Sequence, residues 1–217
     1  MRSYGQYCAL AKALDVVGDR WTLLIIRELL IRGGCRYTDL RDGLPGIATN
    51  LLADRLRELE HHGIIYLEEA PPPIATTLFH LTERGKELET VMQKLGTWGT
   101  PMLAKSSRGD AFRTHWLVLP LEHNLIDRSP DQPPVAVEVR TGDEILTLFT
   151  EGGRVHAKLG ARPHHNAVIS GTPQLVMALL LGKMEIGSAK AAGLKYEGDQ
   201  EVLRRIKPVP TSISSKP

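Results

Sequence analysis

The chain has 217 residues, enough for one large domain or for two domains that each bury a core. Its net charge of +2, from 27 Lys and Arg against 25 Asp and Glu, excludes a nucleic-acid binder that works by overall charge alone. Division after Ala104 gives 12 basic and 13 acidic residues, then 15 and 12. With only Cys8 and Cys35, no membrane-length apolar segment and no signal sequence, we expect a reducing, cytoplasmic location.

Two helices are expected at the start of the chain. The apolar residues of 7–17 recur at helical spacing, Gly18 ends that helix, and Asp19 is positioned to cap the next one. The second helix, 20–31, is strongly apolar. We expect the centre of the first core to consist of Trp21, Leu24, Ile25, Leu29 and Leu30.

Residues 35–65 have the pattern of a helix-turn-helix. Thr38 can cap a short helix, Leu44-Pro45-Gly46 forms a tight turn, and Thr49 can cap a second helix that stops at Gly63. The second helix has an apolar stripe of Leu52, Leu56 and Leu59. The opposite side carries Asn50, Ala53, Asp54 and Arg57. A helix with small and polar groups on its outer side is suited to a DNA major groove.

A wing and a further helix are expected next. Strands at 64–67 and 77–81, joined by the Pro-rich loop 69–76, directly after such a helix make a winged helix. Thr82 caps a helix within 82–98 whose apolar stripe contains Leu88, Val91, Met92 and Leu95. We expect this helix and the N-terminal helix to pack against a second subunit; the alternative is that helix 82–98 covers its own domain.

The second half is expected to be a separate α+β domain after a linker at 106–110. Residues 111–126 are either a helix broken at Pro120 or a helix followed by an extended segment. Four strands, in an antiparallel sheet, and two helices follow. The strands are 135–140, 144–150, 154–159 and 167–170. One helix starts at Thr172-Pro173 and ends at Gly182, and the other lies near 188–192. The predicted divisions are 1–105 for DNA binding and dimerisation, 111–207 for ligand binding, and a disordered tail, 208–217.

Three segments of the first hundred residues share a recognisable order and spacing: 8–29, with its Gly18-Asp19-Arg20-Trp21 motif, the Leu44-Pro45-Gly46-Ile47 turn, and 55–60. Through these segments the first hundred residues resemble the HxlR family of bacterial winged-helix regulators. The resemblance implies a homodimer on a pseudo-palindromic operator, with one recognition helix in each half-site. The chain departs from the family in its wing, where Ile74 follows Pro73 in place of a basic residue and Leu78-Phe79 stands in place of Glu-Tyr. We therefore expect a wing that contributes mainly through its shape.

The second half has a distinctive placement of Gly and Leu in 169–184 and 193–200. By this placement residues 131–206 resemble a sterol-carrier-protein-like domain. The resemblance implies a five-stranded sheet with helices around an apolar tunnel. Seven residues could line that tunnel or could belong to an ordinary closed core: Leu146, Leu148, Val155, Val168, Leu175, Leu179 and Met184.

Candidate DNA contacts cluster in the helix-turn-helix. Base contacts are assigned to Thr49, Asn50, Ala53, Asp54 and Arg57, because Asn pairs with adenine and a Thr or Ala methyl meets the thymine methyl. The alternative for Asp54 and Arg57 is a surface ion pair. Arg36 and Thr38, at the start of the first motif helix, are the expected phosphate contacts.

Other reactive residues are given structural interpretations. We expect Cys8 to be a small buried residue, with a redox sensor as the alternative, and Cys35 to be exposed. His61-His62 and His164-His165 lack further ligands at metal-binding spacing. No nucleophile motif, phosphate loop or zinc signature is present, so we expect neither an enzyme nor a cofactor.

The leading hypothesis is a homodimeric regulator that binds double-stranded DNA and responds to a small apolar effector. Two alternatives remain. The protein could be an apolar-ligand carrier whose helix-turn-helix serves only dimerisation, or a thiol-switch regulator that acts through Cys8.

Overall fold

The computed structural model describes residues 3–71, 76–105, 109–142 and 144–209. The chain divides into two compact units, Met1–Ala111 and Phe112–Pro217. Within the described ranges no helix is long and apolar enough to cross a membrane. The expected linker falls partly outside these ranges, at 106–108.

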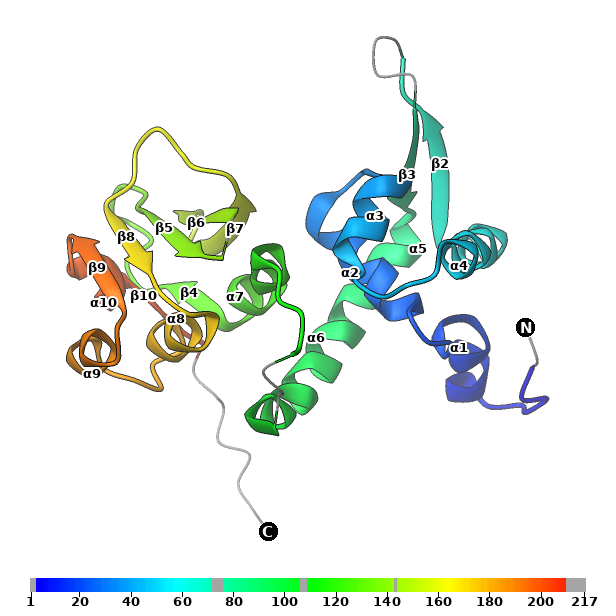
Figure 1. Ribbon diagram of the computed structural model, residues 1–217, viewed down its shortest axis with the longest axis horizontal. Coiled ribbons are helices and arrows are strands. Elements are labelled where there is room, and N and C mark those ends of the chain that lie inside the picture. Colours follow the sequence, from blue (N-terminus) through cyan, green and yellow to red (C-terminus); the bar gives the residue numbers. More distant parts are fainter. Residues whose placement is uncertain (1–2, 72–75, 106–108, 143, 210–217) are drawn as a thin grey trace. The chain divides into compact units, whose positions relative to one another are not determined.

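The first unit is a winged helix (Figure 1). Its elements are α1 (Ala9–Val17), α2 (Thr22–Arg32), β1 (Cys35–Arg36), α3 (Tyr37–Gly43), α4 (Thr49–His61), β2 (Ile65–Glu69), β3 (Thr77–Leu81), α5 (Glu83–Lys86), α6 (Leu88–Gly99) and a 3₁₀ helix (Thr100–Lys105). Strands β2 and β3 form an antiparallel hairpin that projects from the helices, and β1 pairs with β3. The predicted winged helix is therefore confirmed, with a third short strand in its sheet.

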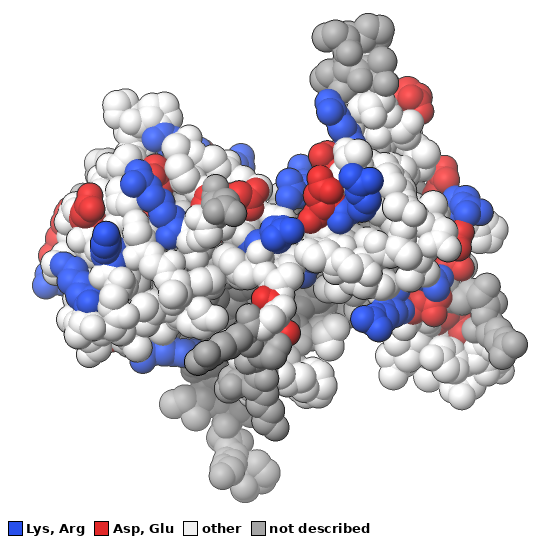
Figure 2. All heavy atoms as spheres, in the orientation of Figure 1, with Lys and Arg blue, Asp and Glu red and all other residues white. Residues whose placement is uncertain are grey.

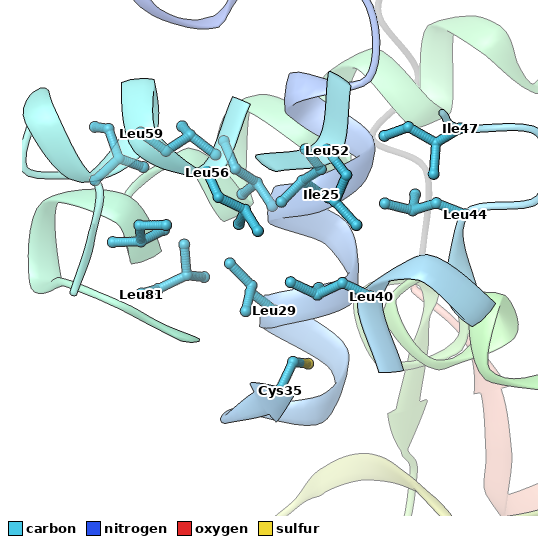
Figure 3. Packing of buried hydrophobic residues seen from close by; sticks show 13 residues of the cluster. Ile25, Leu29, Cys35, Leu40, Leu44, Ile47, Leu52, Leu56, Leu59 and Leu81 are labelled. Carbon is cyan, nitrogen blue, oxygen red and sulfur yellow. The ribbon is translucent and has the colours of Figure 1, made fainter. Parts of the chain in front are cut away.

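The core of the first unit lies where α2, α3 and α4 meet (Figure 3). Leu52, Leu56 and Leu59 of α4 are buried, as their spacing predicts, and face α2. In α2 the prediction is only partly right, because Ile25 and Leu29 are buried but Leu24 is exposed. Successive side chains of a helix are rotated by about 100° around its axis. A long run of apolar residues therefore places some of them on the face that points away from the core.

Three of the predicted helix caps are wrong. Helix α2 starts after Trp21, not Asp19; α3 has Arg36 at its N-cap; and α4 starts after Ala48. Thr38 and Thr49 therefore lie inside the first turns of their helices. In α3 the capping role passes to Asp39, whose carboxylate accepts from the Arg36 N–H at 2.9 Å.

The cap predicted at Thr82 is confirmed. Its hydroxyl oxygen accepts a hydrogen bond from the Gly85 N–H at 3.1 Å and donates to the Gly63 carbonyl at 2.7 Å. This side chain therefore joins the segment that ends α4 to the start of α5.

The second unit contains a seven-stranded sheet in the order β10-β4-β7-β6-β5-β8-β9 (Figure 1). Its elements are a 3₁₀ helix (Thr114–Leu117), α7 (Val118–Asn124), β4 (Leu125–Asp127), β5 (Ala136–Thr141), β6 (Glu144–Glu151), β7 (Arg154–Leu159), β8 (Ala167–Ser170), α8 (Pro173–Leu180), α9 (Ile186–Ala191), β9 (Lys195–Gly198), α10 (Glu201–Arg205) and β10 (Ile206–Pro208). Pro120 lies in the first turn of α7, where its missing N–H costs nothing. Of the two readings of 111–126, the structure thus has the helix followed by an extended segment.

The prediction of a wholly antiparallel sheet is wrong, because β5 and β8 are parallel. Residues 160–166 carry the chain from β7 across one face of the sheet to the far side of β5. Along the way the Gly160 carbonyl accepts from the Thr147 hydroxyl, at 2.7 Å, and the Asn166 side chain accepts from the Ala136 N–H, at 2.9 Å. A crossing segment of this kind returns the next strand in the same direction as β5.

The ends of the sheet were not predicted. Strands β4, β9 and β10 have three or four residues each. The predicted disordered tail begins at Pro208, but Pro208 belongs to β10 and the Val209 N–H donates to the Asn124 carbonyl at 2.8 Å. The rest of that tail, 210–217, lies outside the described residues.

Candidate nucleic-acid interface

The interface is built on α3 and α4, which a short turn joins. Gly46 adopts a φ of 90° in this turn, a conformation that glycine adopts without strain. The Tyr37 hydroxyl, in the first turn of α3, donates to the Thr49 carbonyl at 2.6 Å. The starts of the two helices are thereby held together. Sequence reasoning missed this contact because it joins a side chain to a backbone atom twelve positions away.

The outer face of α4 holds the predicted base-contacting residues: Thr49, Asn50, Ala53, Asp54 and Arg57. All are exposed except Ala53, which is half-buried. The structure brings Asn50, Ala53, Asp54 and Arg57 together on the side of α4 away from the buried leucines, whereas Thr49 is exposed as the first residue of the helix. Both of the predicted phosphate-contacting residues, Arg36 and Thr38, are also exposed.

Two outer-face side chains pair with each other in the free protein. Arg57 donates to Asp54 at 2.5 Å, although 74% of the Arg57 side chain and 54% of the Asp54 side chain remain exposed. The Asn50 side-chain oxygen accepts from the Leu51 N–H at 3.0 Å. Exposed pairs of this kind contribute little to stability, so these groups can exchange their partners for base edges at low cost.

The wing carries negative charge where a DNA contact would favour positive charge. Glu68 and Glu69 lie on β2; Glu68 contacts the His80 ring at 3.1 Å and Glu69 accepts from the Thr77 hydroxyl at 2.8 Å. The tip with the predicted departure at Ile74 lies outside the described residues. The visible face of the first unit also shows acidic and basic side chains intermixed, without a continuous basic surface (Figure 2).

An ion pair beside the outer face was missed by sequence reasoning. Arg55 on α4 forms an ion pair with Asp19, in the segment between α1 and α2, at 2.7 Å and donates a hydrogen bond to Glu58. Its side chain is only 17% exposed. The sequence predicts a local role for Asp19, as a helix cap. It contains no signal that would pair this carboxylate with a residue on a distant helix.

Exposed apolar residues gather on α1 and α6. Leu10 and Leu14 of α1 are exposed, as are Val91 and Leu95 of α6. Leu88 and Met92 of α6 instead pack against the core of their own unit. The helix 82–98 stripe is therefore divided between the two roles that the sequence left open: part of it covers its own unit and part is free to contact another chain.

Both predictions of cysteine burial are wrong. Cys8 is exposed, because it precedes the first residue of α1 on the outside of the unit. Cys35 is fully buried on β1, opposite Phe79, and burial raises the pKa of its thiol to about 12. Local sequence did not reveal that a strand as short as β1 faces the core.

This contrast predicts selective alkylation of the native protein. With iodoacetamide at pH 7 we expect Cys8 to be modified and Cys35 to stay unmodified, because Cys35 is both inaccessible and protonated. Intact-mass and peptide mass spectrometry should show one adduct per chain, and two after denaturation in urea. Modification of Cys35 in the folded protein at a rate similar to that of Cys8 would contradict the assignment.

The predicted ligand-lining residues do not share one face of the second sheet. By the strand register, Leu146, Leu148 and Val155 share one face, and all three are buried. Val168 aligns with Glu138 and Thr147, so it lies on the opposite face. In α8, Leu179 is buried and Leu175 is half-buried, as is Met184 after the helix. The prediction that Val168 lines the same cavity as the other six residues is therefore wrong. The register of the parallel β5–β8 pair places its side chain on the opposite face of the sheet.

No group of three or more His, Cys, Asp or Glu that could hold a metal ion occurs in the described part of the chain.

The model of the HxlR-like helix-turn-helix family matches residues 16–107. An HTH-type transcriptional regulator of Synechocystis sp., sll1512, is 35% identical over 103 residues, covering 48% of this chain and 76% of the relative. YodB, an HTH-type transcriptional regulator of Bacillus subtilis, is 34% identical over 86 residues, covering 40% of this chain and 76% of the relative.

Among solved structures, the reduced form of YodB from B. subtilis aligns with a TM-score of 0.40 at 29% identity. The alignment covers 47% of this chain and all of that one. The matched region of the family model spans α2 to α6, the elements that carry the α3–α4 interface. The chain therefore belongs, through residues 16–107, to the HxlR-like helix-turn-helix family of transcriptional regulators.

Proposed function

We propose that the first unit binds operator DNA as a homodimer and places α4 in the major groove of each half-site. The observation that carries this proposal is the division of α4 between buried leucines and an outer face with exposed Thr49, Asn50, Asp54 and Arg57. Arg36 and Thr38, exposed at the start of α3, are proposed to contact phosphates flanking that groove.

The charge distribution favours recognition through base edges over attraction to the phosphate backbone. In the first unit the numbers of basic and acidic residues are nearly equal. The negative charges of Glu68 and Glu69 on the wing oppose a phosphate contact at that place. A protein that neutralises few phosphates loses little affinity as salt rises. Sequence preference then depends on a few groups on each α4, used twice in a dimer.

The exposed apolar residues of α1 and α6 support the dimer. Leu10, Val91, Leu95 and Trp98 are large side chains left in water in the isolated chain. Burial of apolar area at about 25 cal/mol per Å² is the main force that drives stable association. We place the subunit contact on these two helices.

For the second unit we propose a regulatory role in which a small apolar molecule is bound. The support is its separate compact fold, with its own sheet and core, and the sterol-carrier-like sequence pattern of 131–206. Such an effector would regulate only if it bound the DNA-competent and DNA-incompetent arrangements with different affinity.

The exposed Cys8 supports a second candidate function, a regulator controlled by thiol oxidation. Cys8 lies one residue before α1, so a modification there would act on a helix that we place at the subunit contact. The buried Cys35 is unsuited to that role.

Substitution of the outer face tests DNA binding. Asn50→Ala and Arg57→Ala should each weaken operator binding by about 1–3 kcal/mol, because each removes a base-edge contact. Mobility shifts with the protein's own promoter region, against competitor DNA and over a range of salt, measure this loss. Arg204→Ala, which removes one exposed positive charge from the second unit, is the matched control and should have no effect.

The outcome that would refute the proposal is a wild-type protein that binds its own promoter region no better than competitor DNA at every salt concentration.

A further inference from the structure

We propose that the Asp19–Arg55 ion pair is a positioning device that couples the direction of α1 to the presentation of α4. The inference rests on the proposed function, since it assigns to α4 the role of recognition helix. It adds a means by which a change at the subunit contact would reach the DNA-facing residues.

Arg55 occupies a particular place on α4. It follows Asp54 by about 100° of helix rotation, so it lies on the flank between the outer face and the buried leucines. Its guanidinium pairs with the Asp19 carboxylate at an N···O distance of 2.7 Å and donates a hydrogen bond to Glu58. The Arg55 Nε atom is buried without a hydrogen-bond partner, so the orientation of this side chain leaves one donor unsatisfied. The guanidinium is thus held between the carboxylates of Asp19 and Glu58, with 17% of the Arg55 side chain and 38% of the Asp19 side chain exposed.

The partner carboxylate belongs to an unusual backbone corner. Trp21, two residues after Asp19, has a φ of 79° and is the one non-glycine residue with positive φ within the described ranges. A left-handed conformation is unfavourable for a residue with a side chain, so the surrounding structure must hold it in place. The Trp21 indole lies near Gly46, whose added Cβ would be 3.9 Å from the ring. The corner thus contacts both the α3–α4 turn, through Trp21, and α4 itself, through Asp19.

Helix α1 leads directly into this corner. Gly18 ends α1. A side chain at this position would collide with the carbonyl oxygen of Leu14, in the last turn of the helix. Val16 and Val17 pack against the core of the first unit. Farther toward its start, α1 presents the exposed Leu10 to solvent. Ala11, next to Leu10, is buried as well, so α1 is held along its length and a displacement at Leu10 would act on the corner.

An open groove lies between α1 and α4. It has a volume of about 600 Å³ and is lined by Ser3, Asp15, Asp54, Arg55, Arg57, Glu58, His61 and His62. Besides the packing of Val16 and Val17 on the core, the Asp19–Arg55 ion pair is a direct contact from the corner to α4.

The test compares Asp19→Ala with Glu201→Ala, which also removes one carboxylate from an ion pair but lies in the second unit. Two readouts are needed. One is the ratio of affinities for the promoter region and competitor DNA. The other is the distance distribution, without DNA, between nitroxide labels at positions 13 and 60, exposed on α1 and α4. Labels are attached to cysteines introduced in a Cys8→Ser background, and labelled chains are diluted with unlabelled protein to report distances within one chain.

Asp19→Ala should broaden the label distance distribution and lower the affinity ratio by roughly tenfold, the size of one lost base contact, with competitor affinity unchanged. Glu201→Ala should change neither readout. Asp19→Glu, which keeps the carboxylate, should give the affinity ratio and the distance distribution of the wild type. If Asp19→Ala does not fold, Arg55→Lys, which keeps the charge but loses the planar fork, should give the same broadening.

The proposal is overturned if the distance distribution is unchanged in Asp19→Ala, whatever happens to binding. It is also overturned if binding to all DNA falls to the same degree, as expected of a purely structural role. A wild-type protein without operator preference would refute the proposed function alone, because the distance measurement still reports whether the ion pair sets the α1–α4 geometry.

Discussion

Leu52→Ala is expected to destabilise the first unit by about 2–5 kcal/mol, the usual cost of truncating a buried leucine. Leu52 is fully buried on α4, where it faces Ile25 of α2 (Figure 3). Truncation removes favourable contacts and leaves a cavity that the surrounding helices fill only in part. Because small domains are stable by only about 5–15 kcal/mol, this single change should remove a large share of the total.

Hydrogen exchange followed by mass spectrometry across a urea series measures this effect for each unit separately. Peptides from α2 and α4 should lose protection at lower urea, while peptides from β5 to β8 should not change. Leu67→Ala is the matched control, since Leu67 is 41% exposed on the wing, and its effect should stay within about 0.5 kcal/mol. A loss below about 1 kcal/mol for Leu52→Ala would show that α4 does not pack as described.

Arg205→Ala should destabilise the second unit by about 3–5 kcal/mol, because it leaves a buried carboxylate without its partner. Arg205 donates to both oxygens of Asp127, at 2.7 and 2.8 Å, and its guanidinium also reaches the Gln132 and Pro133 carbonyls. The Asp127 side chain is only 2% exposed. Arg204→Ala, at an exposed neighbour that pairs only with Glu201 among the contacts described for it, should have almost no effect.

The same ion pair predicts a pH dependence. Hydrogen bonds from Arg205, ahead of that from the Ser129 N–H, hold the pKa of Asp127 below its ordinary value of 3.8 despite the opposing effect of burial. A carboxylate whose folded pKa is lowered stabilises the fold fully above its unfolded pKa, and this stability is lost as pH falls through the folded value. Urea unfolding should therefore show Arg205→Ala and wild type converging below pH 3.8, and a constant difference down to pH 2 would contradict this origin.

The parts of the fold that follow from local periodicity could be predicted from sequence. The leucine stripe of α4, the two wing strands and the Thr82 cap all depend on residues a few positions apart, whose spacing fixes their side. The caps at Thr38 and Thr49 could not be predicted to the residue, because the N-cap residues, Arg36 and Ala48, lie two positions and one position before these threonines. Helix boundaries depend on backbone contacts such as Asp39 to Arg36 as much as on residue type.

Features that depend on distant pairing were outside the reach of the sequence. The burial of Cys35 requires β1 to pair with β3, and the facing of Val168 requires β8 to run parallel to β5. For the candidate interface, the outer face of α4 follows from helical spacing alone. The Asp19–Arg55 contact does not, since its two residues are separated by α2 and α3.

The pairing of β4 with β10 has a consequence for biosynthesis. The ion pair of Asp127 and Arg205 lies at the paired ends of these strands, and its two residues are 78 positions apart in sequence. The first unit, in contrast, is complete once α6 has been synthesised. Translation proceeds from the N-terminus at about 5–20 residues per second, and domains fold as units during it. The winged helix can therefore fold on the ribosome seconds before the second unit can close its sheet, and the nascent second unit exposes an unpaired β4 edge throughout that interval.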